Sequence, residues 1–237
     1  MMRLDRMLAE CGFGTRNEVK KLIRSGSVSV SGDIVRNPAA KVDEEHDSVA
    51  VDGEEIVYRR FAWYMLNKPK GYVSSTEGAD SVLNLIAEYD RNLFPCGRLD
   101  KDTEGLLLIT NDGELAHELL SPKHHVEKEY LVTVKNPLKE EDLEVFRKGI
   151  VIDGEEACQP ADYRITDIYE CHLIIREGKY HQIKRMFAAI GNEVTGLKRL
   201  RMKNLVLDES LEPGDYRPLK EEELEDLRRR VPEDPEA

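Results

Sequence analysis

The sequence contains no long apolar run, and this absence bears on where the protein works. Nowhere do uncharged apolar residues continue for the roughly 18 positions that make a transmembrane helix a candidate. The first residues, Met1 to Arg6, carry charges that are not followed by an apolar core, as they would be in a signal peptide. We therefore expect no membrane association, no ordinary secretion and a cytoplasmic location.

Cysteine is scarce, and its placement argues against two kinds of framework. The four cysteines (Cys11, Cys96, Cys158 and Cys171) form no C-x-x-C pair and have no histidine at ligand spacing. This pattern suits reduced thiols better than disulfide bonds or a zinc site. The sequence also lacks a Walker loop and a G-x-G-x-x-G segment, which are glycine-rich patterns that bind phosphates. We expect neither a metal nor a cofactor.

Positive charge is in the minority, but it is unevenly distributed. The chain has 35 Lys and Arg residues against 47 Asp and Glu, a formal net charge of −12. Residues 1–41 nevertheless hold eight basic and four acidic residues, and residues 176–203 hold eight basic and two acidic ones. Because phosphate binding depends on local patches of charge, these two regions keep a nucleic-acid partner possible.

The first 58 of the 237 residues read as a small basic unit. Thr15 and Glu18 have the spacing of a capping box and predict the start of a helix. This helix should end at Gly26, because glycine favours the conformation that terminates helices. Alternating apolar residues at Val28 and Val30 then predict a hairpin.

The rest of the chain, residues 59–237, predicts a larger domain of mixed structure. Strands are expected at 63–66, 106–110 and 130–134, a turn at 67–71, and a helix over 181–190. The strands and helices do not alternate regularly, which favours an α+β fold over a doubly wound sheet. From about residue 221 an acidic segment should begin as a solvated helix and form a partly flexible tail.

The densest group of polar residues is the loop 97–105, which directly precedes an apolar strand. Such a loop could be a surface loop with local salt bridges. It is not a calcium loop, because Asn111 stands where the bidentate glutamate belongs. In a third interpretation, one carboxylate acts as nucleophile or base while a nearby cation keeps it ionised.

The third interpretation agrees with a resemblance to a known family. Residues 97–107 resemble the catalytic motif of pseudouridine synthases, especially the branch that modifies small-subunit ribosomal RNA. Further segments resemble other motifs of the family in the same order, namely 67–71, 128–130 and 177–186. The basic unit resembles the S4 RNA-binding domain. The resemblance covers residues 1 to about 219 and implies an S4-like domain followed by a catalytic domain, whose mainly antiparallel sheet is flanked by helices.

The resemblance also assigns roles to individual residues. It implies that Asp100 is the catalytic carboxylate, that Lys184 pairs with it, and that Tyr130 stacks on the uracil or helps to move a proton. Apart from the resemblance, we expect Asp102 to fix the loop by accepting hydrogen bonds from backbone amides rather than to take part in catalysis. The residues expected to contact RNA are Arg98, Arg16, Lys20, Lys21, Arg24, Lys68, Lys179, His181 and Arg185. The isomerisation has no redox step, so the resemblance implies no cofactor.

Other functions remain compatible with these residues. The chain could be a ribosome-associated RNA-binding protein without activity, in which the Asp100 loop is incidental. It could be a glycoside-cleaving hydrolase, with Asp102 or Glu104 as the second carboxylate. Within the family, the large-subunit ribosomal RNA is the alternative substrate. We expect a monomer that acts on ribosomal RNA or on a pre-ribosomal small-subunit particle.

Overall fold

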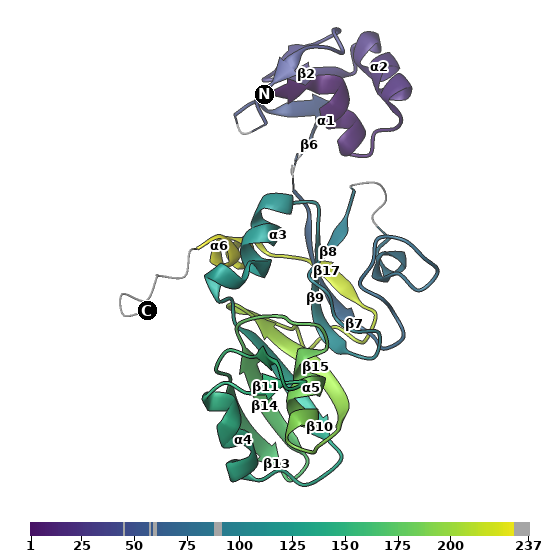
Figure 1. Ribbon diagram of the computed structural model, residues 1–237. Helices are drawn as coiled ribbons and strands as arrows, with labels where there is room; N and C mark the ends of the chain where they lie inside the picture. Colours follow the sequence, from purple (N-terminus) through teal and green to yellow (C-terminus); the bar gives the residue numbers. More distant parts are fainter. Residues whose placement is uncertain (45, 57, 59–60, 88–91, 230–237) are drawn as a thin grey trace. The chain divides into compact units, whose positions relative to one another are not determined.

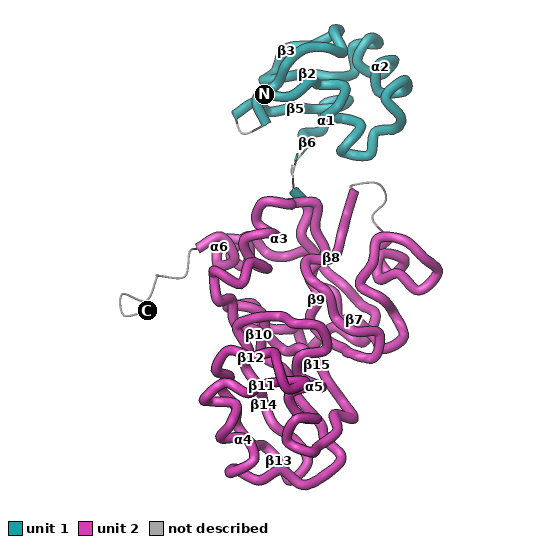
Figure 2. Tube along the Cα trace, in the orientation of Figure 1, with its two compact units in different colours: residues 1–61 teal, residues 62–237 magenta. Residues whose placement is uncertain are grey.

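A computed structural model describes the chain except for residues 45, 57, 59–60, 88–91 and 230–237. It divides into two compact units, Met1–Phe61 and Ala62–Ala237 (Figure 2). The sequence of residues 57–60 is typical of a linker between the two units, and three of these four residues lie outside the described residues. No helix in the described part of the chain has the length and apolar character needed to span a membrane.

The first unit packs two helices against short strands. Its elements are β1 (Met2–Arg3), α1 (Leu4–Glu10), α2 (Arg16–Ser25), β2 (Val28–Val30), β3 (Asp33–Ile34), β4 (Lys41–Val42), β5 (Val49–Val51) and β6 (Glu54–Ile56). Strands β3-β2-β5-β6 form an antiparallel sheet, and β1 pairs with β4. Apolar side chains from both helices, including Leu4, Leu8 and Ile23, are completely buried with Val28.

The predicted limits of α2 are confirmed. The Thr15 side chain accepts a hydrogen bond from the backbone of Glu18 at 3.4 Å, and the Glu18 carboxylate accepts one from the Thr15 backbone at 2.7 Å. Gly26 ends the helix with φ of 88°, a conformation that glycine adopts without steric cost. The expected basic residues Arg16, Lys21 and Arg24 are exposed on α2, and Lys20 is half-buried.

The second unit is built on a nine-stranded sheet (Figure 1). Its strands are β7 (Trp63–Lys68), β8 (Phe94–Cys96), β9 (Glu104–Thr110), β10 (Lys128–Val134), β13 (Asp162–Asp167), β14 (Glu170–Ile175), β15 (Val194–Met202), β16 (Leu205–Val206) and β17 (Tyr216–Pro218). The order is β13-β14-β10-β15-β9-β7-β17, with β16 on β15 and β8 on β9. The β15–β9 pair is parallel and the other pairs of this sheet are antiparallel, which confirms the expected α+β architecture.

Helices and a small hairpin accompany this sheet. They are η1 (Val82–Leu85), α3 (Gly113–Leu120), η2 (Pro122–His124), α4 (Glu140–Arg147), α5 (Gln182–Ala189) and α6 (Glu221–Arg228), with the hairpin β11 (Val151–Ile152) and β12 (Glu156–Ala157). Phe146 of α4 and Phe187 of α5 meet edge to face, with 5.2 Å between ring centroids. Both rings are fully buried in the core with Val132 and Leu173 of the sheet.

One prediction for the second unit needs correction. Asn67 and Lys68, expected in a turn, are the last residues of β7, and their side chains are buried. The helix expected to begin at about residue 221 is α6, whose Leu224 and Leu227 are buried; the rest of the expected tail, residues 230–237, lies outside the described residues. The Lys203 ammonium donates a hydrogen bond to the Leu227 carbonyl at 2.6 Å, which fixes the end of this helix.

Candidate active site

The polar loop 97–103 connects β8 to β9 and carries Asp100. Just after the loop, Gly105 of β9 has φ of +98°, at the point where β9 pairs with β15. A Cβ atom at this position would lie 2.3 Å from the Arg199 carbonyl oxygen. Only glycine therefore permits the close approach of the two strands that places the loop.

A buried lysine forms hydrogen bonds to the backbone of this loop. The Lys68 side chain is 0% exposed, and its ammonium donates hydrogen bonds to the carbonyls of Thr103 (2.7 Å), Pro69 (3.1 Å) and Lys101 (3.4 Å). The same Lys101 carbonyl accepts a bond from the Gly71 amide at 2.8 Å. Burial lowers the pKa of Lys68 to about 8. The expectation that Lys68 contacts RNA is wrong, because no part of its side chain reaches the surface.

A second anchor, which sequence reasoning missed, is Ser74. Its hydroxyl donates a hydrogen bond to the Leu99 carbonyl and accepts one from the Leu99 amide, both at 3.0 Å. These bonds fix the backbone next to Asp100 from the segment that follows β7. A serine among small polar residues gives no signal in the sequence.

Lys184 of α5 contacts the polar loop 97–103. Its ammonium lies 2.9 Å from Oδ2 of Asp100 and 2.6 Å from Oδ1 of Asp102. The hydrogen bond from Lys184 lowers the pKa of Asp102. Burial opposes the charge on Lys184, but its hydrogen bonds to Asp102 and Asp100 outweigh that effect and raise its pKa. The Asp102 carboxylate is therefore a partner of Lys184, besides any role in fixing the loop.

The Asp100–Lys184 pair lies in a pocket lined by both polar and apolar side chains. Tyr130 of β10, almost fully buried, lines this pocket with Ile175 and Leu197. His181 also lines the pocket, and its Nε2 lies 3.6 Å from Oδ1 of Asp100. The structure thus brings the three expected catalytic residues (Asp100, Tyr130 and Lys184) to one cavity. Among the described residues, no group of three or more His, Cys, Asp or Glu side chains is arranged to hold a metal.

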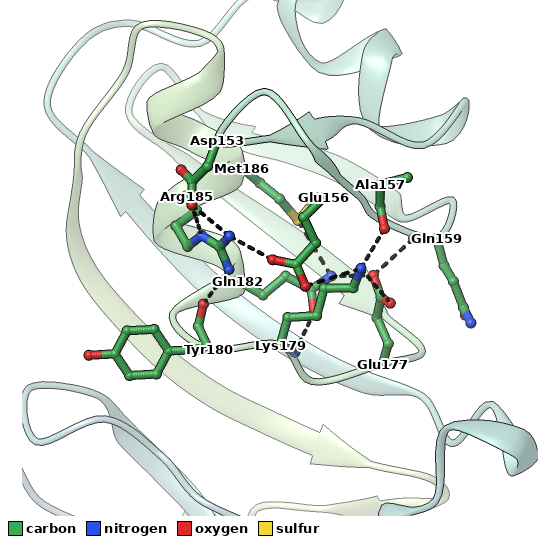
Figure 3. A network of polar contacts seen from close by, with 10 residues as sticks. All are labelled: Asp153, Glu156, Ala157, Gln159, Glu177, Lys179, Tyr180, Gln182, Arg185 and Met186. Atoms are coloured by element: carbon green, nitrogen blue, oxygen red, sulfur yellow. Dashed lines mark hydrogen bonds and ion pairs between the residues drawn. The ribbon is translucent and has the colours of Figure 1, made fainter.

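The other residues expected to contact RNA are divided between the surface and internal networks. Arg98 is exposed at the edge of the pocket. Arg185 contacts Asp153 and Glu156, with its guanidinium 2.6 Å from each carboxylate. The Lys179 ammonium lies 3.5 Å from Glu156 and donates to the Ala157 carbonyl (Figure 3). RNA contact by these two residues stays a prediction, since their charges are first shared with protein carboxylates.

Comparison with known proteins gives two family matches. The family model for RNA pseudouridylate synthase matches residues 62–189, and the S4 domain model matches residues 2–54. The chain is 46% identical to an uncharacterised RNA pseudouridine synthase of Bacillus subtilis, over 94% of this chain and 97% of the relative. It is 44% identical to ribosomal small subunit pseudouridine synthase A of Escherichia coli K12, over 94% and 98%.

A solved structure agrees with these matches. A crystal structure of a pseudouridylate synthase superposes with a TM-score of 0.67 and 42% sequence identity. The alignment covers 96% of this chain and all of that one. The similarity therefore extends over both units.

Proposed function

The chain belongs to the RNA pseudouridylate synthase family, and we propose that it converts a uridine of small-subunit ribosomal RNA to pseudouridine by means of Asp100. The proposal for the substrate is supported by the name of the Escherichia coli relative and by the S4 domain match. The observation that carries the proposal for the site is the contact between Asp100 and Lys184 in a pocket that Tyr130 lines.

The reaction is an isomerisation, and its atoms balance without a co-reactant. The bond between N1 of uracil and C1′ of ribose breaks, the base turns, and a bond forms between C5 and C1′. A proton leaves C5 and N1 takes one up, so the product has the same mass as the substrate. A carboxylate that assists departure of the base must be ionised when the substrate binds. The ammonium of Lys184 lies 2.9 Å from the Asp100 carboxylate and places an opposite charge beside it.

Tyr130 and the rigid loop define where the base can lie. The target uridine must leave its stack in the RNA, at a cost of a few kcal/mol, before its ribose can reach Asp100. Stacking against an aromatic side chain offsets part of this cost. Because Tyr130 is held between two neighbouring strands, its ring can provide that surface without a loss of its own freedom. Hydrogen bonds from Ser74 and Lys68 to the loop backbone keep Asp100 in place.

We also propose the context in which the enzyme works. It acts as a monomer in the cytoplasm, on ribosomal RNA or on a pre-ribosomal small-subunit particle. The first unit presents exposed basic residues on α2, which suits contacts with phosphates that set affinity without reading sequence. The catalytic unit selects the uridine.

The substrate can be tested in cells. Pseudouridines are mapped across both ribosomal RNAs from cells that lack the protein, from cells that regain it, and from cells that receive Asp100→Asn. We expect one small-subunit position to lose its pseudouridine and to recover it with the wild-type protein alone. Loss of a large-subunit position instead would overturn the proposed substrate, and an unchanged map would contradict the proposed activity.

Removal of residues 1–61 should weaken substrate binding and leave the chemistry intact. The second unit has its own hydrophobic core, so we expect it to remain folded. Three exposed cations of α2 are lost with the deletion, so the slope of log KM against log salt should become shallower by roughly two to three. The full-length triple variant R16Q/K21Q/R24Q should reproduce this change. An insoluble fragment, or an unchanged KM in both proteins, would contradict the division of roles.

A further inference from the structure

Tyr180 is an exposed aromatic residue next to the catalytic pair. Its side chain is 77% exposed, and its ring stacks on that of His181 with 3.8 Å between centroids and 21° between planes. His181 in turn lies 3.6 Å from Asp100. One face of the Tyr180 ring is thus covered by His181, and the other can receive a further flat group at the edge of the active site.

A hydrogen bond from Arg185 fixes the backbone that carries this ring. Arg185 donates a hydrogen bond to the Tyr180 carbonyl at 2.9 Å, while its guanidinium is held by Asp153 and Glu156 of the β11–β12 hairpin. Figure 3 shows the Tyr180 ring pointing away from this network. The exposure of Tyr180 therefore does not arise from a loose segment.

A second set of hydrogen bonds fixes the residues before and after Tyr180. The Lys179 amide donates to Oε1 of Gln182 at 2.9 Å, and Nε2 of Gln182 donates to the buried Glu177 carboxylate at 2.7 Å. The backbone of His181 has φ of 47°, which is uncommon for a residue other than glycine. The turn places His181 beside Asp100. The stacked Tyr180 ring lies on the far side of His181 and extends the site toward solvent.

We propose that the outer face of Tyr180 stacks on an unpaired nucleobase that adjoins the target uridine. This inference rests on the proposed function and adds a contact that selects the local RNA structure. When the target uridine leaves its stack, its neighbours lose a stacking partner. Aromatic side chains bind such unstacked bases through their flat faces, with little preference for the identity of the base. Tyr180 can replace the missing partner, and its phenol can keep contact with water.

The test uses the full-length protein and an RNA fragment that contains the mapped uridine. Tyr180→Ala should raise KM by about 5- to 150-fold, the range expected for loss of one ring–base stack, with kcat changed far less. Tyr180→Phe and Tyr180→Trp should restore KM, because a flat ring suffices. The matched control is Tyr169→Ala, since Tyr169 is an exposed tyrosine of the same unit that lies in the turn between β13 and β14.

A double-mutant cycle identifies the base. Two RNA fragments carry an abasic site on the 5′ or on the 3′ side of the target. At the stacked position, the abasic site should raise KM for the wild-type enzyme and cause little further loss in Tyr180→Ala, because both changes remove one contact. Equal KM values for Tyr180→Ala and Tyr169→Ala, or additive effects at both flanks, would overturn the proposal. Absence of turnover by the wild-type enzyme would instead overturn the proposed function, and the stack with it.

Discussion

Asp100→Asn is expected to abolish turnover while leaving RNA affinity within a few-fold of the wild-type value. The amide has nearly the shape of the carboxylate but lacks its charge, so it cannot act as nucleophile or base. Loss of an essential nucleophile costs several orders of magnitude in other enzymes, and we expect at least a 1,000-fold fall in kcat here. Release of tritium from RNA labelled at C5 of uridine measures turnover, and filter binding measures affinity.

The matched control is Asp102→Asn on the same loop. Asp102 also binds Lys184, at 2.6 Å, but its side chain is 68% exposed. Its replacement leaves the contact between Lys184 and Asp100, so we expect kcat to fall by less than about tenfold, since exposed ion pairs contribute little. If Asp100→Asn retained more than a few per cent of the tritium release, or if Asp102→Asn were the inactive variant, the assignment of Asp100 would be wrong.

Lys184→Met should produce the second largest loss. The ammonium lies 2.9 Å from Asp100. Among the described residues, no other lysine or arginine lies within salt-bridge distance of that carboxylate, and its other neighbour is the His181 ring at 3.6 Å. Removal of one preorganised electrostatic group typically lowers kcat by about 100- to 1,000-fold. Methionine keeps the length and apolar stem of lysine, so the change tests the charge. Single-turnover kinetics with saturating enzyme separates this effect from any loss of RNA binding.

Lys184→Arg is the companion variant. Arginine keeps the charge but presents a planar fork in place of a point charge, so we expect measurable activity below that of the wild type. The raised pKa of Lys184 means that the lysine stays protonated across the neutral range. The wild-type rate should therefore show no titration of this group there. A Met variant with the wild-type rate would show that Lys184 does not serve Asp100.

The sequence was informative where a local pattern determines a structure. The capping box at Thr15 and Glu18 predicted the start of α2, and Gly26 predicted its end. The motif around Asp100 identified the loop, and the spacing of apolar residues predicted α5, which presents Lys184 to it. Each of these depends on neighbours within a few positions or on a resemblance to a known motif.

The charges of residues 176–203 could not be interpreted in the same way. Their local excess of basic residues suggested an RNA-binding surface, but strand pairing brings carboxylates from elsewhere. Glu127 lies 2.7 Å from Arg176 and 3.0 Å from Arg201, while Arg199 is buried. Which acid faces which base depends on the register of β10 with its two neighbours. A sum of charges along the sequence contains no information about that register.

The most direct test of the central claim is the fate of the base in the product. Small-subunit ribosomal RNA from cells lacking the protein is incubated with the purified enzyme, digested to nucleosides and analysed by chromatography with mass spectrometry. Asp100→Asn serves as the control. We expect the gain of one pseudouridine per RNA, with no change in mass and no free uracil. Release of uracil at the rate of turnover would show that Asp100 supports hydrolysis, and RNA that binds but stays unchanged would contradict catalysis altogether.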